Sequence, residues 1–502
     1  ALLSKKANKP VKLLNNRQEE MEAARPMVPM KIWSRIGMSR DGRLLAKESK
    51  IFADNGAYSS HGPAVMIAAA IRFDSVYRQQ NIKTGATLVY TNNTPTGAYR
   101  GYGANQAAFA LESHLDIMAR ELDIDPLDLR LRNATQTGDV SVHGWKIMSS
   151  GLTECLKRVA TASKWSKQRP KRKKAHGLGL ACSTHICGFR SPTPLKGSTA
   201  KVQIDEDGRI QVITGEGDIG QGAATVFTQI VAEELSVSPA KIEVSSLDTE
   251  KTPLSLGAYA SRVTVIGGNA VLNAARDAKG KIFKMAAFIL GEEPTEFYLK
   301  KEKVWSKTSP GKSITLKDVA TEADRKGTPI IGEGAHEYEG DLLDKKTLFG
   351  NLSSNYSFSA HIAEVEVDPE TGVVQVIRQF CAHDIGRAIN PMACEGQIEG
   401  GVAQGMGCAL SEALIRHQGK ILNSGFTDYK IPKAADMPQI KAFLVESNDP
   451  IGPYGAKGMG EEVAVPVAPA ICNAIFDAIG VRVKELPIKP EKILRELRRM
   501  QG

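Results

Sequence analysis

The stretch from residue 201 to 225, KVQIDEDGRIQVITGEGDIGQGAAT, contains the pattern that decides the fold. In Lys201–Thr214, apolar and polar residues alternate on both sides of a turn rich in Asp and Gly, which is typical of a β-hairpin. The same pattern recurs in Ile32–Ala53 and Ile362–Phe380. Each second strand runs into an Asp-x-Gly loop, which predicts a repeated hairpin-to-loop unit. These loops are Asp54-Asn55-Gly56, Asp218-Ile219-Gly220 and Asp384-Ile385-Gly386.

Helical periodicity separates the hairpins. Leu111, Leu115, Met118 and Leu122 recur at the spacing of one amphipathic helix face. Further helices are expected over residues 223–235, 264–287, 395–414 and 467–479. Hairpins that alternate with helices predict an α+β architecture with elongated hairpin/helix subdomains rather than a regular βαβ chain. The stretch 166–175, rich in Lys and Arg around Pro170, predicts a boundary between one domain at 1–170 and another at 171–502.

Composition excludes several classes of protein. The chain has 502 residues, of which 42% are hydrophobic and 24% charged, which excludes a disordered chain, a coiled coil and a collagen-like fibre. The net charge is +9, but seven basic residues lie between Lys164 and Lys174. That run predicts a solvated linker, with docking to an acidic partner or a phosphorylated substrate as the alternative. We expect no nucleic-acid partner, no membrane span and no signal peptide.

The seven cysteines are scattered and form no C-x-x-C pair. Their spacing does not match an iron–sulfur cluster or a structural zinc site. It fits a reducing compartment, so we expect a cytoplasmic protein whose electron-transfer clusters lie on other chains. His185 lies between Cys182 and Cys187, but one His with two Cys is too few for a metal site, so we expect buried apolar packing.

Residues Gly215–Gly220 match the G-x-G-x-x-G dinucleotide fingerprint. A nicotinamide site is disfavoured because the preceding strand alternates and because Glu216 and Asp218 would place carboxylates beside a pyrophosphate. One alternative is a tight turn that leads into a helix. The other is a helix N-terminus with free backbone N–H groups, where Gln221 and Thr225 help to hold a polar cofactor.

Four separated motifs occur together in one order: GAYRGYGANQ, GDIGQGAAT, INPMACEGQIEGGVAQG and GAKGMGE, which begin at residues 97, 217, 389 and 455. With them the sequence resembles the molybdopterin-binding large subunit of the xanthine dehydrogenase/aldehyde oxidase family, the molybdenum hydroxylases. The resemblance covers nearly the whole chain. It implies that residues 1–170 are the remainder of a first molybdopterin-binding domain and that residues 171–502 are the second.

The resemblance also implies which residues form the active site. Glu461, Arg100 and Tyr102 match catalytic positions, and no side chain ligates molybdenum, because the dithiolene sulfurs of the pterin hold it. Without the resemblance, Arg100 reads as a surface ion pair, Tyr102 as core and Glu461 as a helix N-terminal carboxylate, and Gln397 reads as an interhelical contact. The cofactor contacts implied by the motifs are Tyr99, Arg100, Gly220, Gln221, Gly222, Thr225, Ala260, Ser261, Gln397, Lys457 and Gly460.

The implied function is hydroxylation with oxygen from water at an electrophilic C–H carbon of an N-heteroaromatic, purine or aldehyde substrate. Glu461 is the expected general base, and we expect burial to raise its pKa toward working pH. Carbon monoxide dehydrogenases of the family have a Cys where Gly101 stands, so we expect no molybdenum–copper centre. The alternatives are a reductive aromatic acyl-CoA member resembling 4-hydroxybenzoyl-CoA reductase, a nicotinamide-dependent oxidoreductase and a non-catalytic paralogue.

The implied cofactor is molybdenum with molybdopterin, in the cytosine dinucleotide form. Two electrons would leave to partner subunits that carry [2Fe-2S] clusters and FAD. Family large subunits carry roughly a further third of chain upstream, with a Gly-rich loop and a Gln beside the metal. We expect a separate chain to supply that segment.

Overall fold

A computed structural model of the chain describes residues 1–168, 175–189 and 197–501. Residues 169–174 and 190–196 lie outside the described residues, and so does much of the basic stretch that was predicted to mark the domain boundary. The division at residue 170 therefore stays a prediction.

All three predicted hairpins are confirmed, and each continues in the same way. After the hairpin, a helix follows and leads into a third strand that pairs parallel with the second strand. Each unit thus has the order strand, strand, helix, strand. The units are β1 (Met30–Met38), β2 (Leu44–Gly56), α3 (Gly62–Phe73) and β3 (Asn81–Tyr90); β5 (Gly197–Ile204), β6 (Ile210–Thr214), α8 (Ala223–Leu235) and β7 (Ile242–Ser246); and β12 (Tyr356–Val367), β13 (Val374–Asp384), α11 (Pro391–Met406) and β16 (Gln439–Val445).

Two of the three sheets gain a fourth strand. β4 (His176–Ile186) pairs antiparallel with β12, and β11 (Ile330–Glu337) pairs antiparallel with β5. The resulting strand orders are β1-β2-β3, β11-β5-β6-β7 and β16-β13-β12-β4. In each sheet the second strand of the hairpin is central. The predicted Asp-x-Gly loops follow the central strands β6 and β13, whereas Asp54-Asn55-Gly56 is the end of β2 itself rather than a loop.

The predicted helices are present. α4 (Ala104–Glu121) carries the predicted apolar face, and α8 matches its predicted bounds. α9 (Gly268–Leu290) and α11 adjoin π-helical turns at Val263–Gly267 and Gly407–Ser411. α12 (Val467–Ile479) also matches, and it packs against β4 and β12. Residues Glu462–Ile479 are apolar enough to cross a membrane, but 78% of this stretch is buried inside the fold, as in a core helix.

The remaining elements are short or peripheral. The helices are α1 (Leu2–Ala7), α2 (Arg17–Ala23), α5 (Pro126–Asn133), α6 (Leu152–Ser163), α7 (Trp165–Gln168), α10 (Leu316–Arg325) and α13 (Pro490–Gln501). The strands are β8 (Phe297–Lys300), β9 (Lys303–Ser306), β10 (Ser313–Thr315), β14 (Arg416–His417) and β15 (Lys420–Ile421). Short 3-10 turns at 453–455 and 462–464 flank the GAKGMGE motif.

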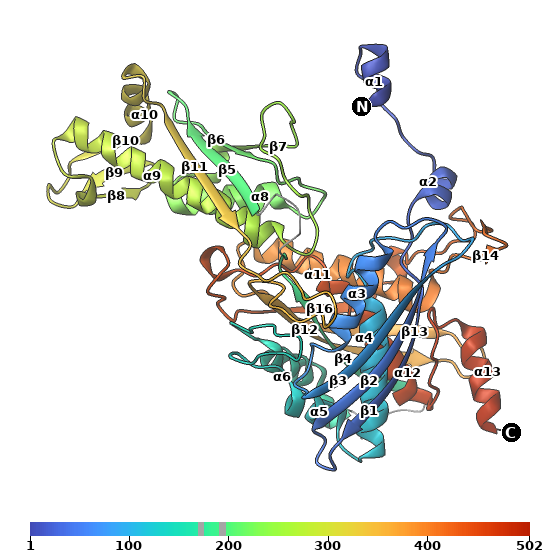
Figure 1. Ribbon diagram of the computed structural model, residues 1–502. Coiled ribbons are helices and arrows are strands. Elements are labelled where there is room, and N and C mark those ends of the chain that lie inside the picture. Colours follow the sequence, from blue (N-terminus) through green and yellow to red (C-terminus); the bar gives the residue numbers. More distant parts are fainter. Residues whose placement is uncertain (169–174, 190–196, 502) are drawn as a thin grey trace.

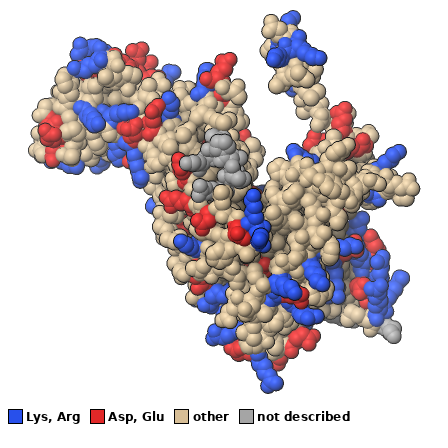
Figure 2. Space-filling model, viewed as in Figure 1, with Lys and Arg blue, Asp and Glu red and all other residues tan. Residues whose placement is uncertain are grey.

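The molecule has a main body and a protruding lobe (Figure 1). The lobe comprises β5 to β11 with α8, α9 and α10, and it has its own apolar core. In the main body, one core joins α4 and α6 with β4, β12 and β13, so residues from both sides of position 170 pack together. Acidic and basic side chains are interspersed on the face in Figure 2, and basic residues gather over α13.

Candidate active site

The motifs that are separated in sequence meet near the carboxyl ends of the central strands. The loop after β13 lies against the loop at residues 455–457, since the Lys457 N–H donates to the Ile385 carbonyl at 2.8 Å. A Cβ at Gly458 would lie 1.9 Å from the Ser261 carbonyl oxygen, so only glycine permits this approach. The fold thus joins the loops at 257–262, 385–390 and 455–461.

Arg100 connects its own loop to the loop at 455–461 and to helix α11. Its Nε donates to the Gly460 carbonyl at 2.6 Å, and its two terminal nitrogens donate to the side-chain oxygens of Gln397 (2.8 Å) and Gln404 (3.1 Å). Gln404 was not predicted, although it lies seven residues after Gln397 on the same face of α11. The guanidinium therefore binds neutral oxygens from two elements rather than a surface carboxylate.

Glu461 lies at the centre of the assembled loops. Its Oε2 accepts from the Gly101 N–H at 3.0 Å and lies 3.4 Å from His185 Nε2. Its own N–H donates to Ser261 Oγ at 3.0 Å. The side chain is 15% exposed, so the carboxylate is bound by protein groups and remains partly accessible to solvent.

The expectation that the pKa of Glu461 is raised is wrong. Burial raises it, but the neighbouring His185 and Arg72 and the Gly101 N–H outweigh burial and lower the pKa to about 2. His185 was expected to pack in apolar surroundings. It is fully buried, but its ring nitrogens are bound to Arg72 and to the Ile186 carbonyl and lie beside Glu461. Nothing in the sequence marked Arg72.

The two tyrosines of the GAYRGYG loop point to different neighbours. Tyr102 is half-buried with φ of 46°, and its hydroxyl is hydrogen-bonded to His61 Nδ1 at 2.9 Å. Burial and the charge of Glu461 raise the pKa of Tyr102. Tyr99 accepts a hydrogen bond from Cys408 Sγ at 3.5 Å and lines a small hollow beside Arg100. The other residues of this hollow are Met27, Asn105, Gln106, Gln404, Gly405, Cys408, Ala464, Val465, Ala468 and Leu486.

Ala260 and Ser261 have an unusual backbone. Both adopt positive φ, at 50° and 51°, a conformation that non-glycine residues adopt rarely and mostly at functional sites. The turn places Ser261 against Glu461, while the Ala260 carbonyl accepts from the Gly188 N–H at 2.7 Å. Their contact with a cofactor stays a prediction.

Of the two alternatives for the loop that leads into α8, the one with free backbone N–H groups is wrong at residues 220, 222 and 224. Asp218 accepts hydrogen bonds from the N–H groups of Gly220 (2.9 Å), Gly222 (3.2 Å) and Ala224 (3.2 Å), so it caps the helix. The Gln221 amide binds its own loop, through the Ile219 N–H and the Gly217 carbonyl. Thr225 is exposed. Any contact of Gln221 with a cofactor would require its side chain to leave the loop.

Two further charged residues have structural partners. Lys457 is 3% exposed, and its Nζ binds Asp384 at 2.7 Å and the Ser149 carbonyl at 3.0 Å, so its side chain is directed away from the site. Glu216, in the G-x-G-x-x-G stretch, forms a buried ion pair with Arg262 at 2.6 Å. A bound pyrophosphate would meet the carboxylates of Glu216 and Asp218, which argues against a nicotinamide site here.

A second buried acid follows Glu461. Both carboxylate oxygens of Glu462 are buried, the Ser357 hydroxyl lies near the carboxyl, and Oε1 lies 3.7 Å from His383 Nδ1. His383 Nε2 is 2.8 Å from His361 Nε2. Burial raises the pKa of Glu462 to about 7 and lowers that of His383 to about 3. In the sequence, only the position of His383 directly before Asp384-Ile385-Gly386 indicated that these buried titratable residues lie near the site.

The assembled loops fit an extended polar cofactor. A Cβ at Gly220, Gly222 or Gly257 would meet nothing within 4 Å, so the backbone there borders open space. Elsewhere in the site Arg100 and Gln397 are polar groups bound to each other, and Asn105 and Gln106 each have a buried side-chain oxygen without a described partner. In the described part of the chain, no group of three or more His, Cys, Asp or Glu is placed to hold a metal ion.

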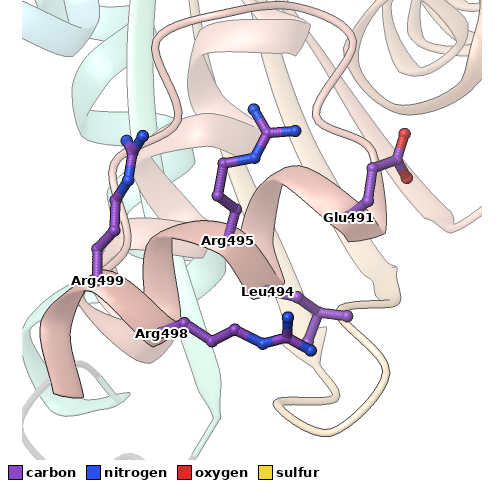
Figure 3. Close-up of a pocket in the computed structure, with 5 residues that line it drawn as sticks. All are labelled: Glu491, Leu494, Arg495, Arg498 and Arg499. Carbon is purple, nitrogen blue, oxygen red and sulfur yellow. The ribbon is translucent and has the colours of Figure 1, made fainter. Parts of the chain in front are cut away.

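A separate hollow lies along the C-terminal helix α13 (Figure 3). It contains no residue of the four motifs. Its lining residues are Glu491, Leu494, Arg495, Arg498 and Arg499.

Comparison with known proteins gives two matches to the molybdopterin cofactor-binding domain, at residues 1–134 and 154–438. The chain is 34% identical, over 99% of its length, to the putative xanthine dehydrogenase molybdenum-binding subunit of Escherichia coli. It is 31% identical, over 96% of its length, to subunit gamma of the 6-hydroxypseudooxynicotine dehydrogenase complex of Paenarthrobacter nicotinovorans. Quinoline 2-oxidoreductase from Pseudomonas putida superposes with a TM-score of 0.90 at 27% identity, over 99% of this chain.

The chain spans slightly less than two thirds of these proteins: 66% and 62% of the two relatives and 65% of the solved chain. The two cofactor-binding matches together cover most of the chain and include the motifs that begin at residues 97, 217 and 389, whereas the motif at 455–461 lies beyond residue 438. The chain therefore belongs to the family of molybdopterin-binding large subunits that includes the molybdenum-binding subunits of xanthine dehydrogenase.

Proposed function

We propose that this chain is the catalytic, cofactor-binding part of a molybdenum hydroxylase that inserts oxygen from water at an electrophilic C–H carbon. The observation that carries the proposal is the convergence of separated motifs on one carboxylate. Gly101 binds Glu461 directly, Ser261 binds its N–H, and Arg100 ties the adjacent Gly460 to Gln397 of α11.

When bound, the molybdenum cofactor supplies the two-electron redox chemistry. Arg100, Gln397 and Gln404 would hold it. Glu461 is the general base: it is ionised at neutral pH and accepts a proton at a carboxylate oxygen as the substrate is hydroxylated. Tyr102, half-buried beside Glu461, would contact the substrate ring.

The substrate class is an N-heteroaromatic, purine or aldehyde. This proposal is supported by the similarity of the chain to subunits of xanthine dehydrogenase, to quinoline 2-oxidoreductase and to aldehyde oxidoreductase. We further propose the cytosine dinucleotide form of molybdopterin, partner chains with [2Fe-2S] and FAD, and a cytoplasmic location. The cysteines in the described residues are all unpaired as thiols, which fits a reducing compartment.

The test is the variant Glu461→Gln in the full chain, purified with any subunits that copurify. Molybdenum content is measured by elemental analysis, and turnover is measured with xanthine, quinoline and benzaldehyde as probes and a dye as electron acceptor. We expect molybdenum content to be unchanged and turnover to fall by roughly 10²–10⁴-fold, the range for loss of a general base. Absence of molybdenum from the unmodified assembly, or equal turnover by the variant, would contradict the proposal.

A further inference from the structure

Two side chains outside the four motifs lie directly behind Glu461. Arg72 comes from α3 and His185 from β4, and they are 5% and 0% exposed. His185 Nε2 lies 3.2 Å from an Arg72 terminal nitrogen and 3.4 Å from Glu461 Oε2. His185 therefore contacts both the Arg72 guanidinium and one oxygen of the carboxylate, and links α3 and β4 to Glu461.

The tautomer of His185 is set by its other ring nitrogen. Nδ1 lies 2.9 Å from the Ile186 carbonyl oxygen, which can only accept, so Nδ1 carries a hydrogen. Nε2 is therefore the ring nitrogen that faces both the Arg72 guanidinium and Glu461 Oε2. His185 thus couples the position of the Arg72 guanidinium to that of the carboxylate.

We propose that Arg72 and His185 form a positioning pair for Glu461: His185 lies against Oε2, which also accepts from the Gly101 N–H, and holds the Arg72 cation near the carboxylate, so that Oε1 is left to accept a proton. The proposal rests on the proposed role of Glu461 as the base. The contacts described above all go to Oε2, and the side chain remains 15% exposed.

Electrostatics agrees with this arrangement. The charged and titratable groups that face Glu461 are Arg72, His185, Arg100, Tyr102 and Glu462. Burial lowers the pKa of Arg72 to about 10, so the guanidinium remains a cation at neutral pH. Without Arg72 and His185, burial would act nearly alone on Glu461 and raise its pKa.

The first test is the pH profile of kcat/KM for Arg72→Met in the full assembly, with a probe from the three above that is turned over. We expect the acid limb to move up by at least one pH unit, while activity at high pH recovers to within a few-fold and molybdenum content is unchanged. A purely structural role would lower kcat/KM by the same factor at every pH, and that result would overturn the proposal.

Two further variants separate positioning from general damage. His185→Gln keeps a polar group near the position of Nε2 and should shift the acid limb in the same direction by a smaller amount. His143→Gln removes a buried histidine that binds Asp74 and not Glu461, so the acid limb should stay in place. An equal shift in both variants would count against the positioning pair.

The second test needs no turnover. The midpoint of urea unfolding at pH 7 is compared for Arg72→Met alone and in the Glu461→Gln background. We expect Arg72→Met to lower the midpoint more when Glu461 is present, because the variant leaves a buried carboxylate without its cation. Additive effects would overturn the positioning pair, whereas full turnover by Glu461→Gln would instead overturn the proposed base.

Discussion

Glu461 and Glu462 are adjacent in sequence, but their pKa values are shifted in opposite directions. The pKa of Glu461 is lowered to about 2, mainly by His185 and Arg72 acting against burial. The pKa of Glu462 is raised to about 7, mainly by burial. Neighbouring carboxyls with diverging pKa values are typical of acid–base sites. At neutral pH one is a carboxylate and the other is close to half-protonated.

Glu462 makes folding stability depend on pH. Its folded pKa lies above the ordinary value of 4.5, so its contribution is fully present below pH 4.5 and is lost as pH rises through 7. We expect Glu462→Gln to become more stable relative to the unmodified protein between pH 5 and pH 8, by on the order of 1–3 kcal/mol. The measurement is urea unfolding at both pH values.

Glu366→Gln is the matched control for this prediction, because it removes an exposed carboxyl from β12. Its stability difference from the unmodified protein should be similar at pH 5 and pH 8. A Glu462→Gln difference that does not change between the two pH values would show that Glu462 does not hold a proton in the folded protein.

At the scale of elements, two sheets pack against a helix in the same way, through glycines in one strand. In β4, a Cβ at Gly179 would lie 2.1 Å from the Ala474 nitrogen of α12. In β11, a Cβ at Gly334 would lie 2.2 Å from backbone atoms of α9. Glycines in the strand and alanines in the helix bring the two backbones into contact. This close packing fixes α12, and therefore the adjoining Glu461, against the sheet that carries His185.

Gly179→Ala should therefore destabilise the main body. The added methyl group meets backbone atoms that cannot rotate away, so the helix must shift, and we expect a loss of about 1–3 kcal/mol in the free energy of unfolding. The matched control is Gly280→Ala in α9, where a Cβ meets nothing within 4 Å. That change should stabilise by about 0.5–1 kcal/mol. Equal effects in urea unfolding would refute the packing argument.

Sequence periodicity predicted these elements well because it reports local preferences. Alternation with Asp-Gly turns located all three hairpins, and helical spacing located α4, α8 and α12. Periodicity did not show that each hairpin gains a parallel third strand, because β3, β7 and β16 pair with strands across an intervening helix. Such pairing depends on where the helix packs.

At the scale of the whole molecule, the lobe and the main body have separate apolar cores. The lobe supplies the loops at 215–222 and 257–262, while the main body supplies Arg100, Gln397 and Glu461. The candidate site is therefore assembled where the two parts join (Figure 1). Its geometry depends on how the lobe is held to the body, in part through the hydrogen bond from the Glu461 N–H to Ser261.

A substitution in the apolar core of the lobe should destabilise the lobe and leave the main body folded. Phe227 of α8 is fully buried in the core of the lobe, so Phe227→Ala should cost about 3–5 kcal/mol within that core. By hydrogen exchange, we expect protection to fall in β5, β6 and α9 while β12 and β13 keep theirs. An equal loss of protection in both parts would show that the cores unfold as one unit.

The sequence by itself determined the hairpins, the main helices and, through four ordered motifs, the family and the position of Glu461. These features depend on short-range periodicity or on runs of adjacent residues. Only the tertiary structure decided which groups surround Glu461, that Asp218 and Lys457 have local partners, and that the pKa of Glu461 is lowered. The physical reason is that Arg72, His185 and Glu461 are brought together by packing between α3, β4 and a distant loop, and a pKa depends on such neighbours rather than on adjacent residues.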